Sequence, residues 1–249
     1  MRIETLTREA GPDWATARDV QQRFMQHPVR AADALDYSGH CRQMHTLGGD
    51  CYDFVPLSNH RLALAVGDAS GKGLAAALMI SNVQSSLRTA AMFSGDNIAA
   101  MIGIVNRQVH ASSHAERYAT LFYGVFDAAS RTLCYVNAGH NPPMILRRDR
   151  SIRWLETSGA PVGMFPDWPY EEAAIPLRSG DLIVAYTDGV IETVNSRGEE
   201  WGLEGLQKAA TEGRRECAGD SVHSIFAAMD RFTGGRQRDD ATVAVLRVR

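Results

Sequence analysis

The chain of 249 residues lacks the features of membrane, secreted and nucleic-acid-binding proteins. No apolar run approaches the length of a membrane span, and no secretory segment is present. The net charge of −3 gives no general attraction to nucleic acid or to anionic membranes. We therefore expect a cytoplasmic protein that binds neither nucleic acid nor membrane.

Cysteine is also scarce, and its spacing excludes the common metal-binding motifs. The four cysteines are Cys41, Cys51, Cys134 and Cys217, which lack the close pairing of a zinc site. This usage is typical of a reduced, cytosolic protein. Internal repeats and low-complexity tracts are absent, and a hydrophobic content of 45% with 22% charged residues is ordinary for a globular domain.

The periodicity of the remaining sequence predicts one α+β domain with many antiparallel strands. Strands are expected at residues 34–41, 51–57, 62–66, 118–126, 133–137, 144–147, 182–186 and 242–248. Helices are expected from Leu74 onward and at residues 97–110, 203–210 and 221–232. No linker composition interrupts the chain from about residue 30, so we divide it into an extension at 1–30 and a domain at 31–249.

The N-terminal extension should contain a helix at residues 13–26. Its apolar face would hold Trp14, Ala17, Val20 and Phe24, and His27-Pro28 would end it. Such a helix can pack on its own domain, act as a linker or pair two subunits.

The stretch from residue 61 to residue 92 organises the rest of the chain. A short apolar run leads into Gly67-Asp68-Ala69-Ser70-Gly71-Lys72-Gly73, and a long helical pattern follows. A nucleotide-binding Walker A loop would need glycine at the position of Val66 and serine or threonine at the position of Gly73. The stretch therefore presents a carboxylate, Asp68, instead of binding a nucleotide phosphate.

Four aspartates stand at comparable places along the chain. Asp50 follows a Gly-Gly pair, Asp68 follows a strand, Asp188 stands at a strand end, and Asp239 precedes the last strand. If they meet in one cleft, their ionised carboxylates repel one another unless a cation neutralises them. Oxygen ligands favour a hard cation, Mg²⁺ or Mn²⁺.

Other polar residues have simpler interpretations. His110 and His114 are four residues apart, but the segment between them lacks the glutamate of a zinc protease motif, which favours a solvated helix end. His140, in a turn that ends in two prolines, is interpreted as a hydrogen-bonding residue that fixes the turn. Asp181 is interpreted as the turn residue before a strand.

Six motifs carry a resemblance to a known family. They are Gly48-Gly49-Asp50-Cys51-Tyr52-Asp53, the Gly67–Gly73 segment, Tyr118-Ala119-Thr120-Leu121, Asn137-Ala138-Gly139-His140-Asn141-Pro142-Pro143, Tyr186-Thr187-Asp188-Gly189 and Asp239-Asp240-Ala241-Thr242. In this order they resemble the PPM-type metal-dependent protein serine/threonine phosphatases. Within these, the chain is similar to the bacterial sporulation stage II E branch, whose members regulate sigma factors by partner switching.

The resemblance implies an α-β-β-α sandwich, in which two packed antiparallel sheets are flanked by helices, with two Mn²⁺ or Mg²⁺ ions at one edge. It implies that Asp68 bridges both ions with help from the Ala69 carbonyl. Asp50 and Asp188 would bind from either side and Asp239 would complete the site, while the role of Asp240 is left open.

Two positions depart from the family pattern. Lys72 replaces a histidine common in this branch, and no arginine upstream of Asp50 matches the phosphate-clamping arginine of the eukaryotic relatives. Four residues are candidates for the clamp: Arg42, Lys72, Arg236 and Arg238.

The implied activity is hydrolysis of phosphoserine or phosphothreonine on a regulatory protein, with an anti-sigma-factor antagonist as the expected substrate. A water that bridges the two metals would attack the phosphoryl group. Two alternatives stay open: a catalytically silent module that binds a phosphoprotein, and a small-molecule phosphoesterase on the same scaffold. About 30 residues precede the domain, so we expect either a fragment of a larger sensor protein or regulation through a partner or a homodimer at the 13–26 helix.

Overall fold

Alternating apolar residues build two five-stranded antiparallel sheets in the computed structural model, which describes residues 12–25, 35–93, 97–113, 116–214 and 217–249. The first sheet has the order β1-β10-β9-β6-β7, formed by Leu35–Arg42, Ala241–Val248, Leu182–Tyr186, Met144–Leu146 and Ile152–Trp154. The second has the order β2-β3-β4-β5-β8, formed by Asp50–Leu57, Arg61–Ala69, Ala119–Asp127, Thr132–Ala138 and Ala173–Pro176. The helices described are α2 (Pro12–Met25), α3 (Leu74–Phe93), α4 (Ile98–Ser112), α5 (Asp188–Ile191), α6 (Gly202–Glu212) and α7 (Ala218–Thr233).

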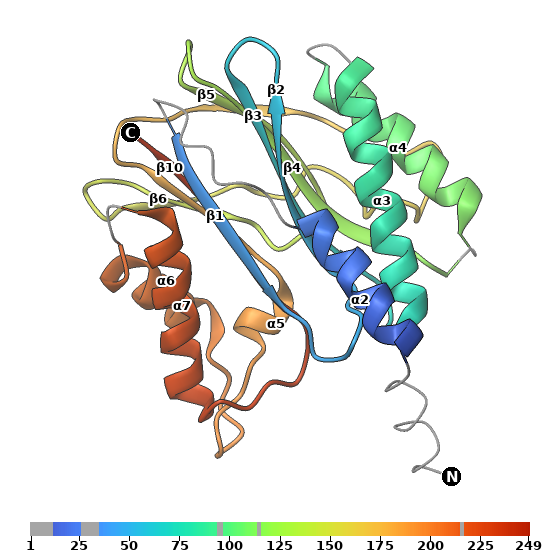
Figure 1. Ribbon diagram of the computed structural model, residues 1–249. Coiled ribbons are helices and arrows are strands. Elements are labelled where there is room, and N and C mark those ends of the chain that lie inside the picture. Colours follow the sequence, from blue (N-terminus) through green and yellow to red (C-terminus); the bar gives the residue numbers. More distant parts are fainter. Residues whose placement is uncertain (1–11, 26–34, 94–96, 114–115, 215–216) are drawn as a thin grey trace.

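The sheets pack face to face, and helices cover both outer faces (Figure 1). Successive strand residues point to opposite faces, so each strand contributes to two apolar layers. On β10, Ala244 and Leu246 pack between the sheets, whereas Val243 and Val245 pack under α6 and α7. On the other side, α3 and α4 cover the outer face of the second sheet. The sandwich expected from the resemblance is confirmed.

Several element boundaries differ from the predictions. Strand β3 extends to Ala69, so Asp68 is a strand residue and does not lie in the turn after the strand. Strands β7 and β8, of three and four residues, were not predicted. Helix α5 begins at Asp188, directly after β9, and was not expected either.

Helix α2 packs on α3 and β2, and three residues of its predicted apolar face, Trp14, Ala17 and Phe24, are partly buried. Val20 is 52% exposed, whereas the polar Gln21 and the apolar Met25 are buried. The predicted apolar face was therefore wrong at Val20, because a hydrogen-bonding partner within the domain makes burial of the polar neighbour favourable. His27-Pro28 lie outside the described residues, and the division of the chain near residue 30 stays a prediction.

Within the described part of the chain, the helices are all too short or too polar to cross a membrane.

Candidate active site

Asp50 and Asp68 face each other across two neighbouring strands. Asp50 opens β2, and its register partner on β3 is Asp68, which is itself opposite Thr120 on β4. Burial raises the pKa of Asp68 to about 7, with further contributions from the negative charges of Asp188 and Asp239. The backbone register thus brings two carboxyls together that lie 18 positions apart in the sequence.

The Asp50 carboxylate is held in place from the other sheet. One of its oxygens, Oδ2, accepts hydrogen bonds of 2.7 Å from the hydroxyls of both Thr187 and Thr242. Asp50 is 2% exposed, and burial followed by the charge of Asp68 raises its pKa well above the usual range. The two threonine hydroxyls oppose that rise and fix the orientation of the carboxylate.

Asp188 and Asp239 come from the adjacent strands β9 and β10. Asp188 follows β9 as the first residue of α5, and Asp239 stands two residues before β10. Burial, and then the charge of Asp239, raises the pKa of Asp188, which a backbone hydrogen bond from Gly189 opposes. The chain passes so closely here that a Cβ atom on Gly189 would lie 1.9 Å from the Asp240 carbonyl oxygen, so only glycine fits.

Asp240 holds the loop that leads to Asp50. Its carboxylate accepts hydrogen bonds from the backbone N–H groups of Met44 at 2.6 Å and Gly49 at 2.7 Å. A Cβ atom on Gly48 would lie 2.5 Å from Asp240 Oδ2, which accounts for glycine at that position. The role that the sequence left open is therefore, in this structure, to position the β1–β2 loop.

The Ala69 backbone joins the same loop. Its N–H donates to the Gly49 carbonyl at 3.0 Å, and a Cβ atom on Gly49 would approach the Ala69 carbonyl oxygen to 3.2 Å. The Ala69 carbonyl thus lies beside Gly49, next to the facing pair of carboxyls.

Gln21 anchors this loop from α2, a contact that sequence reasoning missed. Its side chain donates to the Gly48 carbonyl at 2.7 Å and accepts from the Gly48 N–H at 3.2 Å. Gln43 donates to the same Gln21 side-chain oxygen at 2.7 Å. A glutamine on a predicted helix gives no sequence signal that it will bond to a loop 27 residues away.

Lys72 contributes a positive charge to the acidic cluster. Its ammonium lies 2.5 Å from Asp239 Oδ2, and this hydrogen bond raises the pKa of Lys72. The side chains are 61% and 46% exposed, so solvent screens the pair and it adds little to stability. Lys72 is thus the one predicted clamp candidate for which a direct contact with a cluster aspartate is seen among the described residues.

The other clamp candidates lie elsewhere or point to solvent. Arg42 donates to Asp230 at 2.6 Å and lies 4.3 Å from the centre of the Phe226 ring, so its guanidinium already contacts two residues of α7. Arg236 and Arg238 are exposed. Arg117, which was not considered, donates to the Ser70 carbonyl at 2.9 Å and so supports the turn after β3.

The contacts seen for His110, His140 and Asp181 are with residues other than the four aspartates. His110 bonds to the Gly163 carbonyl at 2.8 Å, and His114 lies outside the described residues. His140 is buried, its Nδ1 lies 2.9 Å from the Thr120 hydroxyl, and burial lowers its pKa to about 4. Asp181 is more than a turn residue, because it is buried and ion-paired with Arg147.

The donor chemistry suits hard divalent cations. Four carboxylates from separate segments lie near one another, and their mutual repulsion is the kind that a bound cation relieves. Among the described residues, however, no group of three carboxylate, imidazole or thiol side chains is already placed to enclose an ion. Binding would require small side-chain movements, including release or sharing of Asp239 by Lys72.

Comparisons with known proteins find relatives of this chain in sequence and in structure. The chain is 29% identical over 234 residues to the phosphoserine phosphatase RsbU of Bacillus subtilis (strain 168), covering 93% of this chain and 68% of RsbU. It matches the RsbU and RsbW domains of Rv1364c from Mycobacterium tuberculosis with a TM-score of 0.73 and 26% identity, covering 87% of this chain and 60% of that one.

A third comparison supports the fold alone. The SiaA-PP2C domain of Pseudomonas aeruginosa matches with a TM-score of 0.84 at 18% identity, covering 97% of this chain and 98% of that domain.

The family described as Stage II sporulation protein E (SpoIIE) matches residues 58–249, which include Asp68, Asp188 and Asp239. The chain therefore belongs to the SpoIIE family.

Proposed function

We propose that this protein is a metal-dependent phosphatase that removes phosphate from phosphoserine or phosphothreonine on a regulatory protein, with an anti-sigma-factor antagonist as the expected substrate. The observation that carries the proposal is the convergence of Asp50, Asp68, Asp188 and Asp239 at one edge of the sandwich. The similarity to RsbU, a protein named as a phosphoserine phosphatase, supports the reaction class.

Two Mn²⁺ or Mg²⁺ ions would be held by the four aspartates and the Ala69 carbonyl. When bound, such a pair of cations activates water and neutralises charge on the phosphoryl group. The protein supplies the arrangement: Thr187 and Thr242 orient Asp50, and Asp240 and Gln21 fix the Gly48–Gly49 segment beside it. These contacts fix Asp50 and its loop before any cation binds, so the movements needed for binding concern the other ligands, above all Asp239.

Lys72 is well placed to act near the phosphoryl oxygens. Its ammonium lies at the exposed side of the cluster on Asp239, where a phosphate approaching from solvent would meet it. With Asp239 serving as a ligand of a divalent cation, the ammonium of Lys72 would be free to contact a phosphate. We therefore favour Lys72 over the arginines as the clamp.

Phosphate release tests the proposal. The purified chain with Mn²⁺ should release phosphate from a serine-phosphorylated anti-sigma-factor antagonist, and EDTA or Asp188→Asn should abolish the release. Activity toward p-nitrophenyl phosphate alone would favour the small-molecule phosphoesterase. Phosphoprotein binding without turnover at any divalent cation would instead favour the silent binding module. Cytoplasmic location and pairing through α2 stay predictions.

A further inference from the structure

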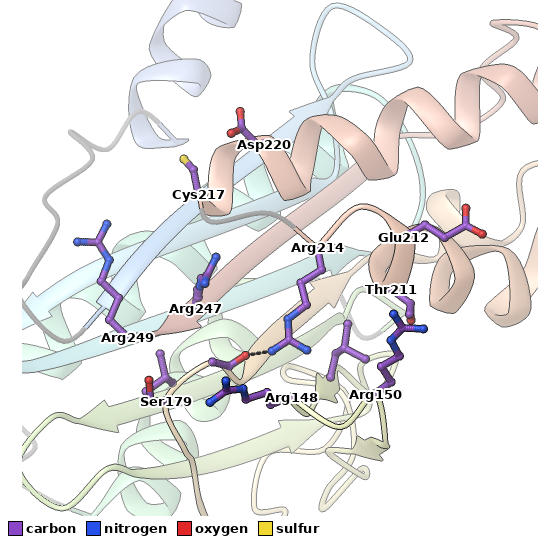
Figure 2. Close-up of a pocket in the computed structure, with 13 residues that line it drawn as sticks. Arg148, Arg150, Ser179, Thr211, Glu212, Arg214, Cys217, Asp220, Arg247 and Arg249 are labelled. Carbon is purple, nitrogen blue, oxygen red and sulfur yellow. Dashed lines mark hydrogen bonds between the residues drawn. The ribbon is translucent and has the colours of Figure 1, made fainter.

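Five arginines line a pocket at one end of β9 and β10. Asp188 and Asp239 lie at the opposite end of these two strands. The pocket has a volume of about 1170 Å³ and is lined by residues of the β6–β7 turn, the end of α6 with Arg214, the start of α7 and the end of β10. Figure 2 shows the arginines that line it, which are Arg148, Arg150, Arg214, Arg247 and Arg249. We refer to this hollow as the arginine pocket.

The charge of the arginine pocket is opposite to that of the whole protein. Among the described residues, five arginines line it against two carboxylates, Glu212 and Asp220, and one of the five, Arg249, lies 4.0 Å from the carboxylate of Asp36, so positive charge remains in excess. The chain as a whole has a net charge of −3. A concave surface lined by one sign of charge concentrates ions of the other sign.

Arg214 lies at the centre of the arginine pocket. Its guanidinium donates to the carbonyls of Arg147, at 2.7 Å, and of Gly180. Burial lowers the pKa of Arg214, and the nearby charges of Arg247, Arg148 and Arg150 lower it further. Figure 2 shows the Arg214 side chain lying among these three, so the fold keeps like charges together at an electrostatic cost that a bound anion would offset.

Asp181, a buried carboxylate near the arginine pocket, already has an ion-pair partner. Asp181 is 1% exposed and is ion-paired with Arg147, so its charge is largely neutralised within the fold. The guanidinium groups of Arg148 and Arg150 belong to exposed side chains on the β6–β7 turn and are available to a ligand from solvent.

We propose that the arginine pocket binds a small ligand that carries two or more linked phosphate groups. Guanidinium groups bind phosphate oxygens through paired hydrogen bonds, and several of them converge here on one hollow. The volume exceeds that of a single phosphate and is comparable to that of small-molecule sites. The pocket-lining residues that the structure describes include no aromatic side chain, so recognition by them rests on the phosphates.

The arginine pocket is separate from the carboxylate cluster. Seven positions along β10 separate Arg247 from Asp240, roughly 23 Å at about 3.3 Å per residue. A ligand bound there cannot reach the proposed metals, so the site would be an additional one and not a subsite for the phosphoserine substrate.

Calorimetric titration with pyrophosphate and tripolyphosphate tests this inference. EDTA and about 0.15 M salt keep divalent cations off the carboxylate cluster and screen non-specific attraction. The wild-type chain should bind, and the double variant Arg148→Gln/Arg150→Gln should bind about tenfold or more weakly, the usual effect of losing hydrogen bonds to charged groups. Because both arginines are exposed, the variant should fold, as its melting temperature will show.

A matched control removes two arginines elsewhere. Arg18→Gln/Arg107→Gln lowers the net charge by the same amount at exposed positions on α2 and α4 and should leave the affinity unchanged. Equal weakening in both double variants, or no binding by the wild type, would overturn the proposal. Neither result depends on phosphatase activity, so the test stands apart from the proposed function.

Cys217 provides a second readout inside the arginine pocket. Its thiol is exposed and lines the hollow, so bound tripolyphosphate should slow its alkylation, measured by mass spectrometry. Cys134, which lies outside the pocket, should react at an unchanged rate. An unchanged rate at Cys217 under saturating ligand would place the ligand elsewhere and contradict the inference.

Comparing the affinities for adenosine triphosphate and for tripolyphosphate distinguishes the source of the phosphates. Equal affinities would support recognition of the phosphate chain alone, and tighter binding of the nucleotide would support a nucleotide ligand of the same site. Binding of a polyglutamate peptide with none of the phosphate ligands would overturn the proposal in favour of an acidic protein surface.

Discussion

Asp68 lies where burial and neighbouring negative charge act in the same direction. Both favour its protonated form and raise its pKa to about 7, and the ammonium of Lys72 opposes them only in part. In the absence of a cation, an ionised Asp68 therefore destabilises the folded protein, and a bound cation reverses the sign of that contribution.

This reversal predicts opposite effects of one substitution. In EDTA near pH 8, Asp68→Asn should raise the melting temperature, because it removes a repelling charge while keeping the side-chain shape. With saturating Mn²⁺ the wild type should gain stability and the variant should gain little. Differential scanning fluorimetry measures both. A variant that melts lower than the wild type in EDTA would contradict the electrostatic account.

His140 gives a pH dependence of the opposite sign to that of a buried carboxyl. Its pKa is lowered from 6.5 to about 4 by burial, so between these values the unfolded state binds the additional proton. Stability from this group is therefore present above pH 6.5 and is lost as the pH falls toward 4.

His140→Gln should remove that loss. From pH 7 to pH 5, the stability advantage of the wild type over the variant should shrink by roughly 2 kcal/mol. Urea unfolding of both proteins at the two pH values measures it, and the comparison cancels the titration of other groups. The same difference at both pH values would show that His140 titrates alike in the folded and unfolded states.

Some residue roles could be predicted from the sequence and others could not. A glycine or a turn next to Asp50, Asp68 or Asp188 indicates a displayed carboxyl, and that is visible in the sequence. The difference between Asp239 and Asp240 is not visible, because it depends on which of two adjacent side chains faces the β1–β2 loop. The ion pair of Lys72 with Asp239 joins residues 167 positions apart and has no local signature.

At the scale of elements, α2 connects the N-terminal part of the chain to the candidate site. Its Phe24 carbonyl accepts hydrogen bonds from Gln84 and Arg88 on α3, and Arg88 is also ion-paired with Asp53 on β2. Through Gln21 the same helix bonds to the loop before Asp50. A change in the docking of α2 would therefore move a proposed metal ligand.

Gln21→Ala tests this connection. The variant loses both bonds to Gly48, so the loop should loosen and Mn²⁺ affinity should fall by about tenfold, the order expected when a group that orients a metal ligand is removed. Gln22→Ala, at the more exposed neighbouring position, is the control and should bind Mn²⁺ like the wild type. Calorimetry of both variants measures the affinities. Equal affinities would show that α2 packs on the domain without shaping the site.

The predicted helices and strands agree with the observed ones where the apolar pattern extends over several residues. Strand β9 was predicted at its observed boundaries, and α7 was predicted within a few residues, because their apolar spacing is regular. The end of β3 was missed because Gly67 and Asp68 are typical turn residues. Pairing with strands on both sides keeps them in the sheet.

At the scale of the whole molecule, the two ends of the sandwich differ in charge. One end gathers Asp50, Asp68, Asp188 and Asp239, and the other holds the arginine pocket. Strands β9 and β10 run between them, so the fold separates a site suited to cations from one suited to anions. The sequence shows the first through its motifs, whereas the arginines of the second converge only in the folded chain.

Calorimetric titration of the metal-free chain with Mn²⁺ tests the central claim most directly. The account predicts about two ions per chain, proton release on binding near pH 7, and loss of both ions in the double variant Asp68→Asn/Asp188→Asn. Absence of Mn²⁺ and Mg²⁺ binding by a folded wild-type chain, or unchanged binding in that double variant, would contradict it.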